Sequence, residues 1–348
     1  MHRQGRQPEA RVTRLNLITD VPGIRVGHAH DAKVATGVTC VLIEGDCVAS
    51  GVVRGGAPGG RDTGLLEPEM TAQGVDAVVL SGGSLFGLDA AGGVVSVLRA
   101  KGVGFKIGGL RVPIATQAII FDLMNGGDKN WGRMPPYWEL GYAAAETARD
   151  GSFPLGTVGG GYGATTATLK GGVGSASAVT ASGFHVGALA VVNAVGSATI
   201  GDGPHFWAAP FEQQGEFGGL GLPRHLPAGA LDLRMKGLAP PSTTIAIVAT
   251  DAVLTKAEAK RIAHMADDGL ARAIRPAHAP MDGDSVIAVA TKRKPLTRPG
   301  IDLTEIGMAA GDCLARAIAR GVYEASALPF AGALPSWRDR FGSGSPTL

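Results

Sequence analysis

Glycine is the residue that sets this chain apart, because 54 of its 348 residues are glycine. That is about one residue in six, against a usual share of about 7% in soluble proteins. The glycines follow no three-residue period, which excludes a collagen-like chain. Since glycine has no Cβ, it permits tight turns and lets two backbone segments approach each other closely. The sequence therefore predicts a fold with many turns and closely packed backbones.

The charges of the chain exclude one class of partner. Charged residues make up 18% and hydrophobic residues 45% of the sequence, a balance typical of globular rather than disordered proteins. The 32 basic residues exceed the 30 acidic ones by only two, and no segment concentrates enough of them to follow a phosphate backbone. We therefore expect no nucleic-acid partner. At about 150 residues per domain, the length fits two domains or one large sandwich.

The cysteines and the N-terminal segment indicate a cytoplasmic protein. Cys40, Cys47 and Cys313 form no CxxC pair, and an odd number of cysteines argues against a disulfide framework. Residues 1–14 are partly basic, but no apolar stretch follows them, so we expect a tail and not a secretory signal. Residues 171–201 contain no Asp, Glu, Lys or Arg. Small residues dominate them, which favours two buried strands over a membrane span, so no membrane partner is expected.

Short apolar runs separated by glycine-rich breaks predict the strands of the fold. They cover residues 37–43, 48–53, 75–80, 188–195, 243–250 and 285–290. Helices are predicted over residues 255–274 and 303–323 and after Ser84, the first of them opened by a Thr-x-x-Glu capping box. Residues 211–241 are rich in glycine, proline and leucine and predict a long irregular connection. Because the strands and helices do not alternate strictly, the expected fold class is layered α+β.

Three familiar kinds of catalytic site find little support in the local sequence. A glycine run at 159–163 precedes Lys170, but a phosphate-binding loop needs Gly before its lysine and Ser or Thr after it. His28 and His30 form an HxH pair, which supplies only two metal ligands and leaves a metal-dependent hydrolase as an alternative. The chain has no GxSxG elbow, and no cysteine lies beside a histidine.

Five segments together carry a resemblance to one family. They are ITDVPGIRVGH from residue 18, RGGAPG from 54, LSGGS from 80, STTIAIVATD from 242 and MDGDSVIAV from 281. On these segments the chain resembles the N-terminal-nucleophile (Ntn) amidohydrolases, which include the L-aminopeptidase/D-amidase/D-esterases, the β-aminopeptidases and the nylon-oligomer hydrolases. The resemblance covers nearly the whole chain. It implies a four-layer αββα sandwich over residues 15–348, and no cofactor.

The resemblance also implies that the chain cuts itself between Ser242 and Thr243. The two pieces, 1–242 and 243–348, would stay associated, and the family implies a homotetramer of such cleaved protomers. Cleavage exposes an α-amino group on Thr243, and the ordinary pKa of such a group, about 7.7–8.0, suits a general base at neutral pH. The hydroxyl attacks a substrate amide while the amine takes its proton, so nucleophile and base lie on one residue. The expected reaction is hydrolysis of small amides or peptides, and of esters, through an acyl-Thr243 intermediate.

The resemblance assigns four further residues to the site. Asn193 is implied as an oxyanion donor, and Lys170 as a cation that keeps the amine neutral. Asp282 and Asp284 are implied as carboxylates that orient the amine and assist proton transfer. From the residues alone, other interpretations stay open: a solvated turn lysine at 170, and a hairpin turn at the Asp-Gly-Asp sequence.

The chain departs from the family at two positions. Phe121 stands where the family has a tyrosine that helps the oxyanion site, and a phenyl ring donates no hydrogen bond. Ile119 stands where the aminopeptidases hold the substrate's amine with an acidic residue, and nearby Asp122 has the wrong parity for that role in an extended segment. The threonine nucleophile and the Asp-Gly-Asp sequence are nearer to the nylon-oligomer hydrolases. An endo-acting oligoamide hydrolase is therefore one alternative to an aminopeptidase, and an uncleaved binding protein on the same fold is another.

Overall fold

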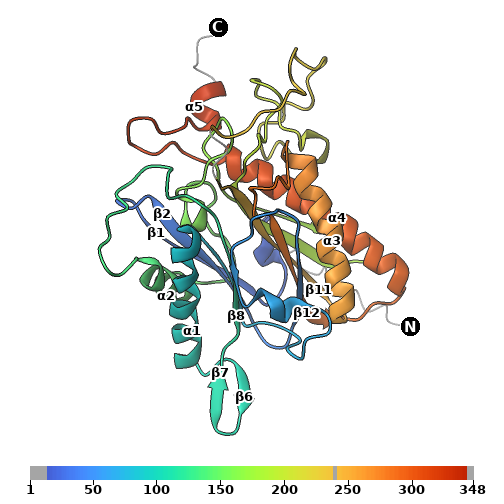
Figure 1. The fold of residues 1–348 in the computed structure, drawn as a ribbon. Coiled ribbons are helices and arrows are strands. Elements are labelled where there is room, and N and C mark those ends of the chain that lie inside the picture. Colours follow the sequence, from blue (N-terminus) through green and yellow to red (C-terminus); the bar gives the residue numbers. More distant parts are fainter. Residues whose placement is uncertain (1–13, 238–240, 343–348) are drawn as a thin grey trace, which may run out of the picture.

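Two five-stranded sheets form the centre of the structure, a computed structural model that describes residues 14–237 and 241–342 (Figure 1). Apolar side chains from the two sheets face each other and form a core between them. Two further apolar cores lie on the outer faces of the sheets, under helices. The covering helices are α1 (Ala90–Ala100) and α2 (Tyr137–Glu146) on one sheet, and α3 (Lys256–Ala273) and α4 (Pro299–Tyr323) on the other. The predicted αββα sandwich is thus confirmed.

The first sheet is mixed and lies under α1 and α2. Its strands, in spatial order, are β1 (Ile24–Asp31), β2 (Thr36–Ile43), β5 (Ala77–Ser81), β8 (Ala115–Ile119) and β4 (Gly60–Arg61). Only β5 and β8 are parallel, and the other neighbours are antiparallel. The middle strands are buried on both faces, because helices cover one face and the second sheet covers the other.

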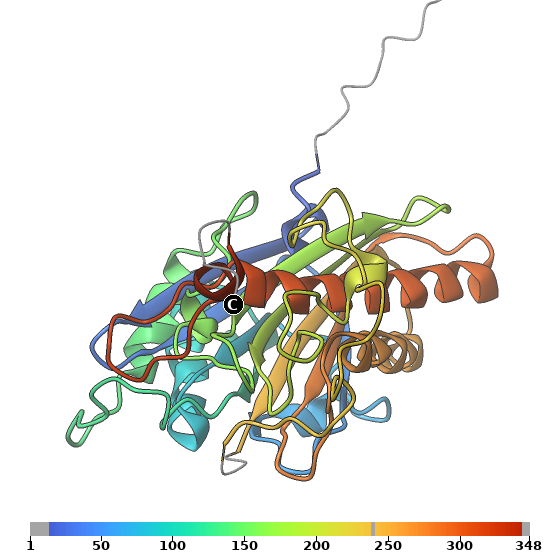
Figure 2. The same ribbon diagram turned by 90° about the horizontal axis from the view of Figure 1, so that it is seen from above.

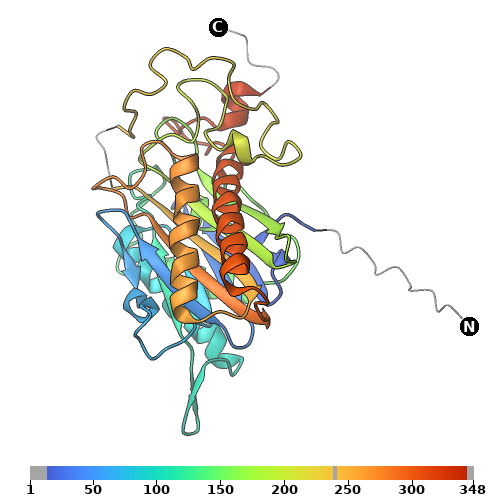
Figure 3. The same ribbon diagram turned by 90° about the vertical axis from the view of Figure 1, so that its right-hand side faces the viewer.

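The second sheet is also mixed and lies under α3 and α4. Its strands, in spatial order, are β3 (Val48–Val53), β12 (Ser285–Lys294), β11 (Thr243–Ala252), β10 (His185–Asn193) and β9 (Gly172–Val179). Strands β11 and β12 are parallel, whereas β10 runs antiparallel to both of its neighbours. All ten residues of β11 are buried. Figure 3 shows α3 and α4 side by side over this sheet.

Shorter elements complete the described fold. They are the strands β6 (Phe105–Ile107) and β7 (Leu110–Val112), the helix α5 (Trp337–Phe341), and 3₁₀ turns at Ile18–Asp20, Thr63–Leu66, Ser84–Asp89, Gly159–Gly161 and Ala209–Phe211. Strands β6 and β7 form a hairpin that projects below α1 in Figure 1. The described part of the connection 211–241 has no regular element after its first residue and lies at one end of the sandwich, toward the viewer in Figure 2.

Glycine allows the helices to lie directly on the second sheet and on each other. A Cβ added to Gly174 in β9 would lie 1.8 Å from the carbonyl oxygen of Ala317 in α4. A Cβ added to Gly269 in α3 would lie 2.1 Å from the carbonyl oxygen of Gly311 in α4. No side chain fits into such gaps, so the backbones themselves are in contact. These contacts account for part of the high glycine content.

The predicted elements are found, with shifted ends. All six predicted strands are present, and residues 171–201 contain β9 and β10, joined by a turn in which Gly183 has a φ of +79°. The Thr255 side chain accepts a hydrogen bond from the N–H of Glu258, so the capping box that opens α3 is confirmed. Apart from Arg14, the expected tail 1–14 lies outside the described residues. Within the described ranges, no helix combines the length and apolarity needed to cross a membrane.

Candidate active site

Thr243 and Asn193 face each other across two neighbouring strands. Thr243 begins β11, Asn193 ends β10, and the antiparallel register pairs these two residues. The parallel pairing of β11 with β12 brings together the segments that precede these strands, so Ser242 forms a bridge with Asp282. Thr243 is 4% exposed and Asn193 is fully buried. The structure therefore gathers the predicted threonine, asparagine and Asp-Gly-Asp sequence at one end of the second sheet.

The peptide bond between Ser242 and Thr243 is held by hydrogen bonds to its carbonyl oxygen. The N–H of Gly283 donates to the Ser242 oxygen at 2.9 Å, and the Thr243 hydroxyl donates to the same oxygen. Gly283 lies so close that a Cβ added to it would be 2.8 Å from Thr243 Oγ1. A carbonyl that accepts two hydrogen bonds is polarised toward attack at its carbon atom. The hydroxyl that would attack it already lies beside it.

The Asp-Gly-Asp sequence is not the hairpin turn that it resembles, because it leads into β12, which runs parallel to β11. Asp284 accepts a hydrogen bond at 2.7 Å from the N–H of Thr244 and one at 2.9 Å from the N–H of His278. Burial raises the pKa of Asp282 to about 7, and the neighbouring Asp284 adds to the rise. A carboxyl group that titrates near neutral pH is suited to proton transfer.

His278 connects Asp284 to a second buried carboxylate, that of Asp267 in α3. His278 Nδ1 lies 3.1 Å from Asp284 Oδ2, and its Nε2 lies 3.5 Å from Asp267 Oδ2. Arg54 Nε lies 3.5 Å from the same Asp267 oxygen. The hydrogen bond to Asp284 raises the pKa of His278, and Asp267 contributes to the rise. The sequence did not predict this chain of contacts. The available signal was an aspartate on the apolar face of the predicted helix 255–274.

Several donors fix the orientation of the Asn193 amide. Its Oδ1 accepts hydrogen bonds from the Thr165 N–H at 3.0 Å, from Lys236 Nζ at 3.1 Å and from Asn125 Nδ2 at 3.2 Å; these are three donors on one oxygen. Its Nδ2 donates to the Phe121 carbonyl oxygen at 3.0 Å. Three partners donate to one amide atom and the fourth accepts from the other, so the hydrogen bonds identify which atom is the oxygen and which is the nitrogen. An amide held in this way is preorganised to act as a donor.

Lys170 is buried among backbone carbonyl groups. Its Nζ donates to the carbonyl oxygens of Gly161, Ala164 and Gly171 at 3.0, 2.8 and 2.8 Å. An ammonium group has three N–H bonds, so these contacts use all of them. Burial lowers the pKa of Lys170 to about 7. Lys170 is 1% exposed and is therefore not a solvated turn residue. It braces the loop whose Thr165 N–H contacts Asn193.

Lys236 was not among the predicted site residues, and it lies in the irregular connection before the Ser242–Thr243 bond. Its side chain is the cation that contacts Asn193 Oδ1, and the residue is 8% exposed. Burial lowers the pKa of Lys236 to about 7, an effect opposed by Asp282 and Asp122. No periodicity marks this lysine, because the segment that carries it has no regular structure.

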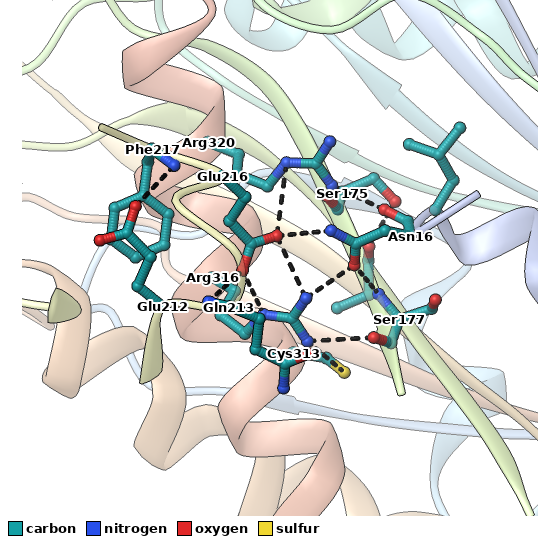
Figure 4. Close-up of polar contacts among 12 residues, drawn as sticks. Asn16, Ser175, Ser177, Glu212, Gln213, Glu216, Phe217, Cys313, Arg316 and Arg320 are labelled. Carbon is teal, nitrogen blue, oxygen red and sulfur yellow. Dashed lines mark hydrogen bonds and ion pairs between the residues drawn. The ribbon is translucent and has the colours of Figure 1, made fainter. Parts of the chain in front are cut away.

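A buried ion-pair cluster anchors the start of the same connection (Figure 4). Arg316 Nε in α4 lies 2.5 Å from Glu216 Oε1, with side-chain exposures of 1% and 7%. Asn16 accepts a hydrogen bond from Arg316 at 2.7 Å and donates one to Glu216 at 2.5 Å. Arg320 Nε lies 3.7 Å from Glu216 Oε2. The cluster ties the N-terminal segment and the connection to a helix from the C-terminal third of the chain.

The two positions at which the chain departs from the family, 119 and 121, lie at and just after the end of β8. Phe121 takes part through its backbone carbonyl, which accepts from Asn193. Ile119 ends β8 and is 5% exposed. Asp122 is fully buried, where it accepts hydrogen bonds from the Thr36 hydroxyl at 2.7 Å and the Gly83 N–H at 2.8 Å. Both of its oxygens are therefore engaged within the protein.

The two histidines of the HxH pair have separate surroundings. His28 Nδ1 lies 2.9 Å from Thr39 Oγ1, and burial lowers the pKa of His28 to about 4. The His30 ring stacks on Tyr162 with a centroid distance of 4.4 Å. Over residues 14–237 and 241–342, no three His, Cys, Asp or Glu side chains are grouped as metal ligands. The metal hypothesis therefore gains no third ligand there.

Comparisons with solved structures support the fold. The structure of an L-aminopeptidase D-Ala-esterase/amidase from Ochrobactrum anthropi aligns with a TM-score of 0.69 at 21% identity, covering 93% of this chain and 91% of that one. That protein is described as a new variant among the Ntn hydrolase fold. At this level of identity, the likeness concerns the fold alone.

Comparisons with other sequences give the family. An uncharacterized aminopeptidase from Mycobacterium tuberculosis (strain ATCC 25618 / H37Rv) is 43% identical, covering 94% of this chain and 98% of the relative. A 6-aminohexanoate-oligomer endohydrolase from Kocuria sp. (strain KY2) is 28% identical, covering 82% and 78% of the two chains. The sequence model of peptidase family S58 matches residues 16–333, nearly the whole chain. The chain therefore belongs to peptidase family S58.

Proposed function

We propose that the protein is a self-processing Ntn hydrolase that cleaves small amides or peptides through an acyl-Thr243 intermediate. One observation carries this proposal: the Thr243 hydroxyl lies against the carbonyl of the preceding peptide bond, and the Gly283 N–H donates to the same oxygen. A buried threonine that begins a central strand needs no such arrangement for packing. Family membership supports a peptidase, and the site geometry supports the choice of nucleophile.

The first reaction is cleavage of the chain itself. Thr243 Oγ adds to the Ser242 carbonyl carbon, the C–N bond breaks, and the acyl group passes from nitrogen to oxygen. The hydroxyl proton goes to the departing nitrogen. Asp282, whose backbone pairs with that of Ser242 and whose carboxyl pKa is raised by burial, is the proposed carrier for this transfer. Water then hydrolyses the ester. The products are a carboxylate on Ser242 and a free amine on Thr243.

The second reaction is turnover of a substrate. The new α-amino group accepts the Thr243 hydroxyl proton as the oxygen attacks the substrate amide, and that proton passes to the leaving amine. Water releases the acid from the acyl-Thr243. Asn193 Nδ2 acts as an oxyanion donor, Asp284 orients the start of β11 through the Thr244 N–H, and Lys170 braces the loop behind Asn193. The homotetramer implied by the resemblance stays a prediction.

A cavity of about 550 Å³ supports a small substrate, and its lining combines apolar side chains such as Val52, Leu66 and Ile287 with the polar Glu67, Lys260 and His264. Its wall includes Pro58 and Ser285, the latter directly after Asp284. A Cβ added to Gly283 would lie 2.8 Å from Thr243 Oγ1 and 3.2 Å from Pro58 Cα, so this wall comes close to the nucleophile. The names of the relatives include both aminopeptidases and oligoamide hydrolases. Position 119 carries no acidic side chain, and Glu67 in the cavity wall is paired with Lys260 at 2.9 Å, so we favour an uncharged amide over a substrate held by its free amine.

Mapping the ends of the active protein tests this proposal. Denaturing mass measurement is expected to give two chains, and N-terminal sequencing of the smaller one is expected to read Thr-Thr-Ile-Ala. Active material that contains only the intact 35.3 kDa chain would contradict the proposal. It would instead favour a different catalyst or an uncleaved binding protein.

Asn193→Ala is expected to slow hydrolysis by about 10²–10³-fold, the usual effect of losing one oxyanion donor. The measurement is kcat on a small amide with protein that has first been shown by circular dichroism to be folded. Asn130→Ala is a suitable control, because Asn130 is exposed and its side chain lies outside this network. Unchanged turnover in Asn193→Ala would remove Asn193 from the site.

A further inference from the structure

Lys236 contacts the proposed catalytic amide from a segment with no regular structure. Its Nζ lies 3.1 Å from Asn193 Oδ1 and 3.4 Å from the Asn193 carbonyl oxygen. Its backbone N–H donates to the Val195 carbonyl oxygen at 2.8 Å, which anchors the residue two positions beyond Asn193. A lysine held at both its backbone and its ammonium group, and 8% exposed, is not a solvated surface residue.

The two buried lysines near the site differ in what they touch. Lys170 donates its three N–H bonds to backbone carbonyl oxygens, so it fixes the loop that contains Gly161 and Ala164. Lys236 places its charge on the side-chain oxygen of Asn193. A cation at the oxygen of an amide draws electron density from its nitrogen, which makes the N–H groups stronger donors. The effect of Lys236 would therefore reach the oxyanion through Asn193.

We propose that Lys236 is a positioning residue that holds Asn193 Oδ1 and strengthens the Asn193 Nδ2 donor beside Thr243. This inference rests on the proposed function, because it assumes that Asn193 stabilises an oxyanion. The cation that acts on the site would then be Lys236, in the irregular connection just before the bond that is proposed to be cut. After cleavage Lys236 would remain in the 1–242 piece together with Asn193, so the pair would serve both self-cleavage and turnover.

Charges around Lys236 predict how its effect varies with pH. Burial lowers the pKa of Lys236 to about 7, while Asp282 and Asp122 act in the opposite direction. Lys170 is a further cation nearby, since Lys236 contributes to lowering the pKa of Lys170. The charged ammonium is lost as pH rises through about 7, and its hydrogen bond to Asn193 weakens. The Thr243 amine must be neutral to act as a base, so turnover should rise with pH as this amine loses its proton. Turnover should fall with pH as the Lys236 ammonium loses its proton.

The test compares lysine variants by kcat, KM and pH profile on a small amide. Lys236→Met is expected to lower kcat by about 10–10²-fold, with KM changed by less than about threefold, because the lost interaction belongs to the transition state. Lys236→Arg keeps the charge at all working pH values and is expected to retain most of the activity while losing the decline above pH 7. Lys256→Met is the matched control, since Lys256 is 4% exposed and its Nζ holds the backbone carbonyls of Leu65 and Ala72.

A double-mutant cycle tests whether Lys236 acts through Asn193. If it does, adding Lys236→Met to Asn193→Ala lowers kcat by less than about twofold, because coupled residues are not additive. An undiminished effect in that background would overturn the proposal. Activity of Lys236→Met within twofold of the unchanged protein would also overturn it. If Lys236→Met does not fold, the pH profile of Lys236→Arg decides instead. A fall in kcat at alkaline pH identical to that of the unchanged protein would overturn the proposal. Each variant is assayed only after N-terminal sequencing shows that its smaller chain starts at Thr243. The presence of that chain in the unchanged protein tests the proposed function, whereas the kcat comparison between cleaved variants tests the role of Lys236.

Discussion

Thr243→Ala is expected to leave the chain intact at 35.3 kDa and without amidase activity. The substitution removes the only atom that the proposed reaction uses as nucleophile, in cleavage and in turnover alike. Without cleavage no α-amino group forms, so the general base is missing as well. Denaturing electrophoresis after prolonged incubation measures the first effect, and an amide assay measures the second. The expected loss is complete in both measurements.

Thr244→Ala is the control for that variant. Thr244 is buried beside Thr243, but its contact with Asp284 is made by the backbone N–H, which alanine retains. Its hydroxyl has no hydrogen-bond partner within the described residues. Cleavage should therefore proceed in Thr244→Ala. Cleavage that persisted in Thr243→Ala would refute the assignment of the nucleophile.

Gly174→Ala is expected to produce the largest loss of stability among single-methyl additions in the second sheet. The added Cβ would lie 1.8 Å from the Ala317 carbonyl oxygen and 2.4 Å from the Gly321 nitrogen. Both atoms belong to the backbone of α4, so no side chain can turn away, and the helix must move off β9. Overpacking usually costs about 1–3 kcal/mol, and a backbone clash this close should cost about 3 kcal/mol or more in the free energy of unfolding.

Gly51→Ala in β3 is the matched control for that prediction. There the added Cβ would lie 3.1 Å from Leu66 Cδ1 and 3.3 Å from the Val286 carbonyl oxygen. The closest neighbour is the end of a flexible side chain, so we expect a change of less than about 1.5 kcal/mol. Chemical denaturation of the two variants measures the difference. Equal losses would show that α4 does not rest on the backbone of β9.

Apolar runs made part of the fold predictable from the sequence. A strand covered on both faces carries an almost unbroken apolar run, and β3 and β11 begin at the predicted residues for this reason. Strand β8 was not predicted in this way, because Thr116 and Gln117 interrupt its apolar run. Gln117 is nevertheless buried and donates to the Ser81 hydroxyl at 2.7 Å. Only the tertiary structure shows that a polar side chain there has a partner.

The candidate site was predictable only in part. Thr243, Asn193 and the Asp-Gly-Asp sequence came from the resemblance to a family, and the register of β10, β11 and β12 brings them together. Lys236 and His278 could not be found in this way. Each lies in an irregular segment, where no periodicity relates sequence position to direction, and each meets its partner only after the chain has packed. Their lowered and raised pKa values likewise arise from burial and neighbours, which a single sequence does not contain.

The central place of β11 bears on how such a protein must be synthesised. β11 and β12 would belong to the 243–348 piece, yet they lie between β10 and β3, which belong to 1–242. The Glu216–Arg316 ion pair also joins the two pieces. Neither piece could complete the sheet alone, and each would expose unpaired strand edges to water. Under the proposed self-cleavage, one continuous chain would fold before the Ser242–Thr243 bond is cut. If residues 1–242 and 243–348 were instead translated from separate mRNAs, the shared sheet would have to assemble from two unfolded chains.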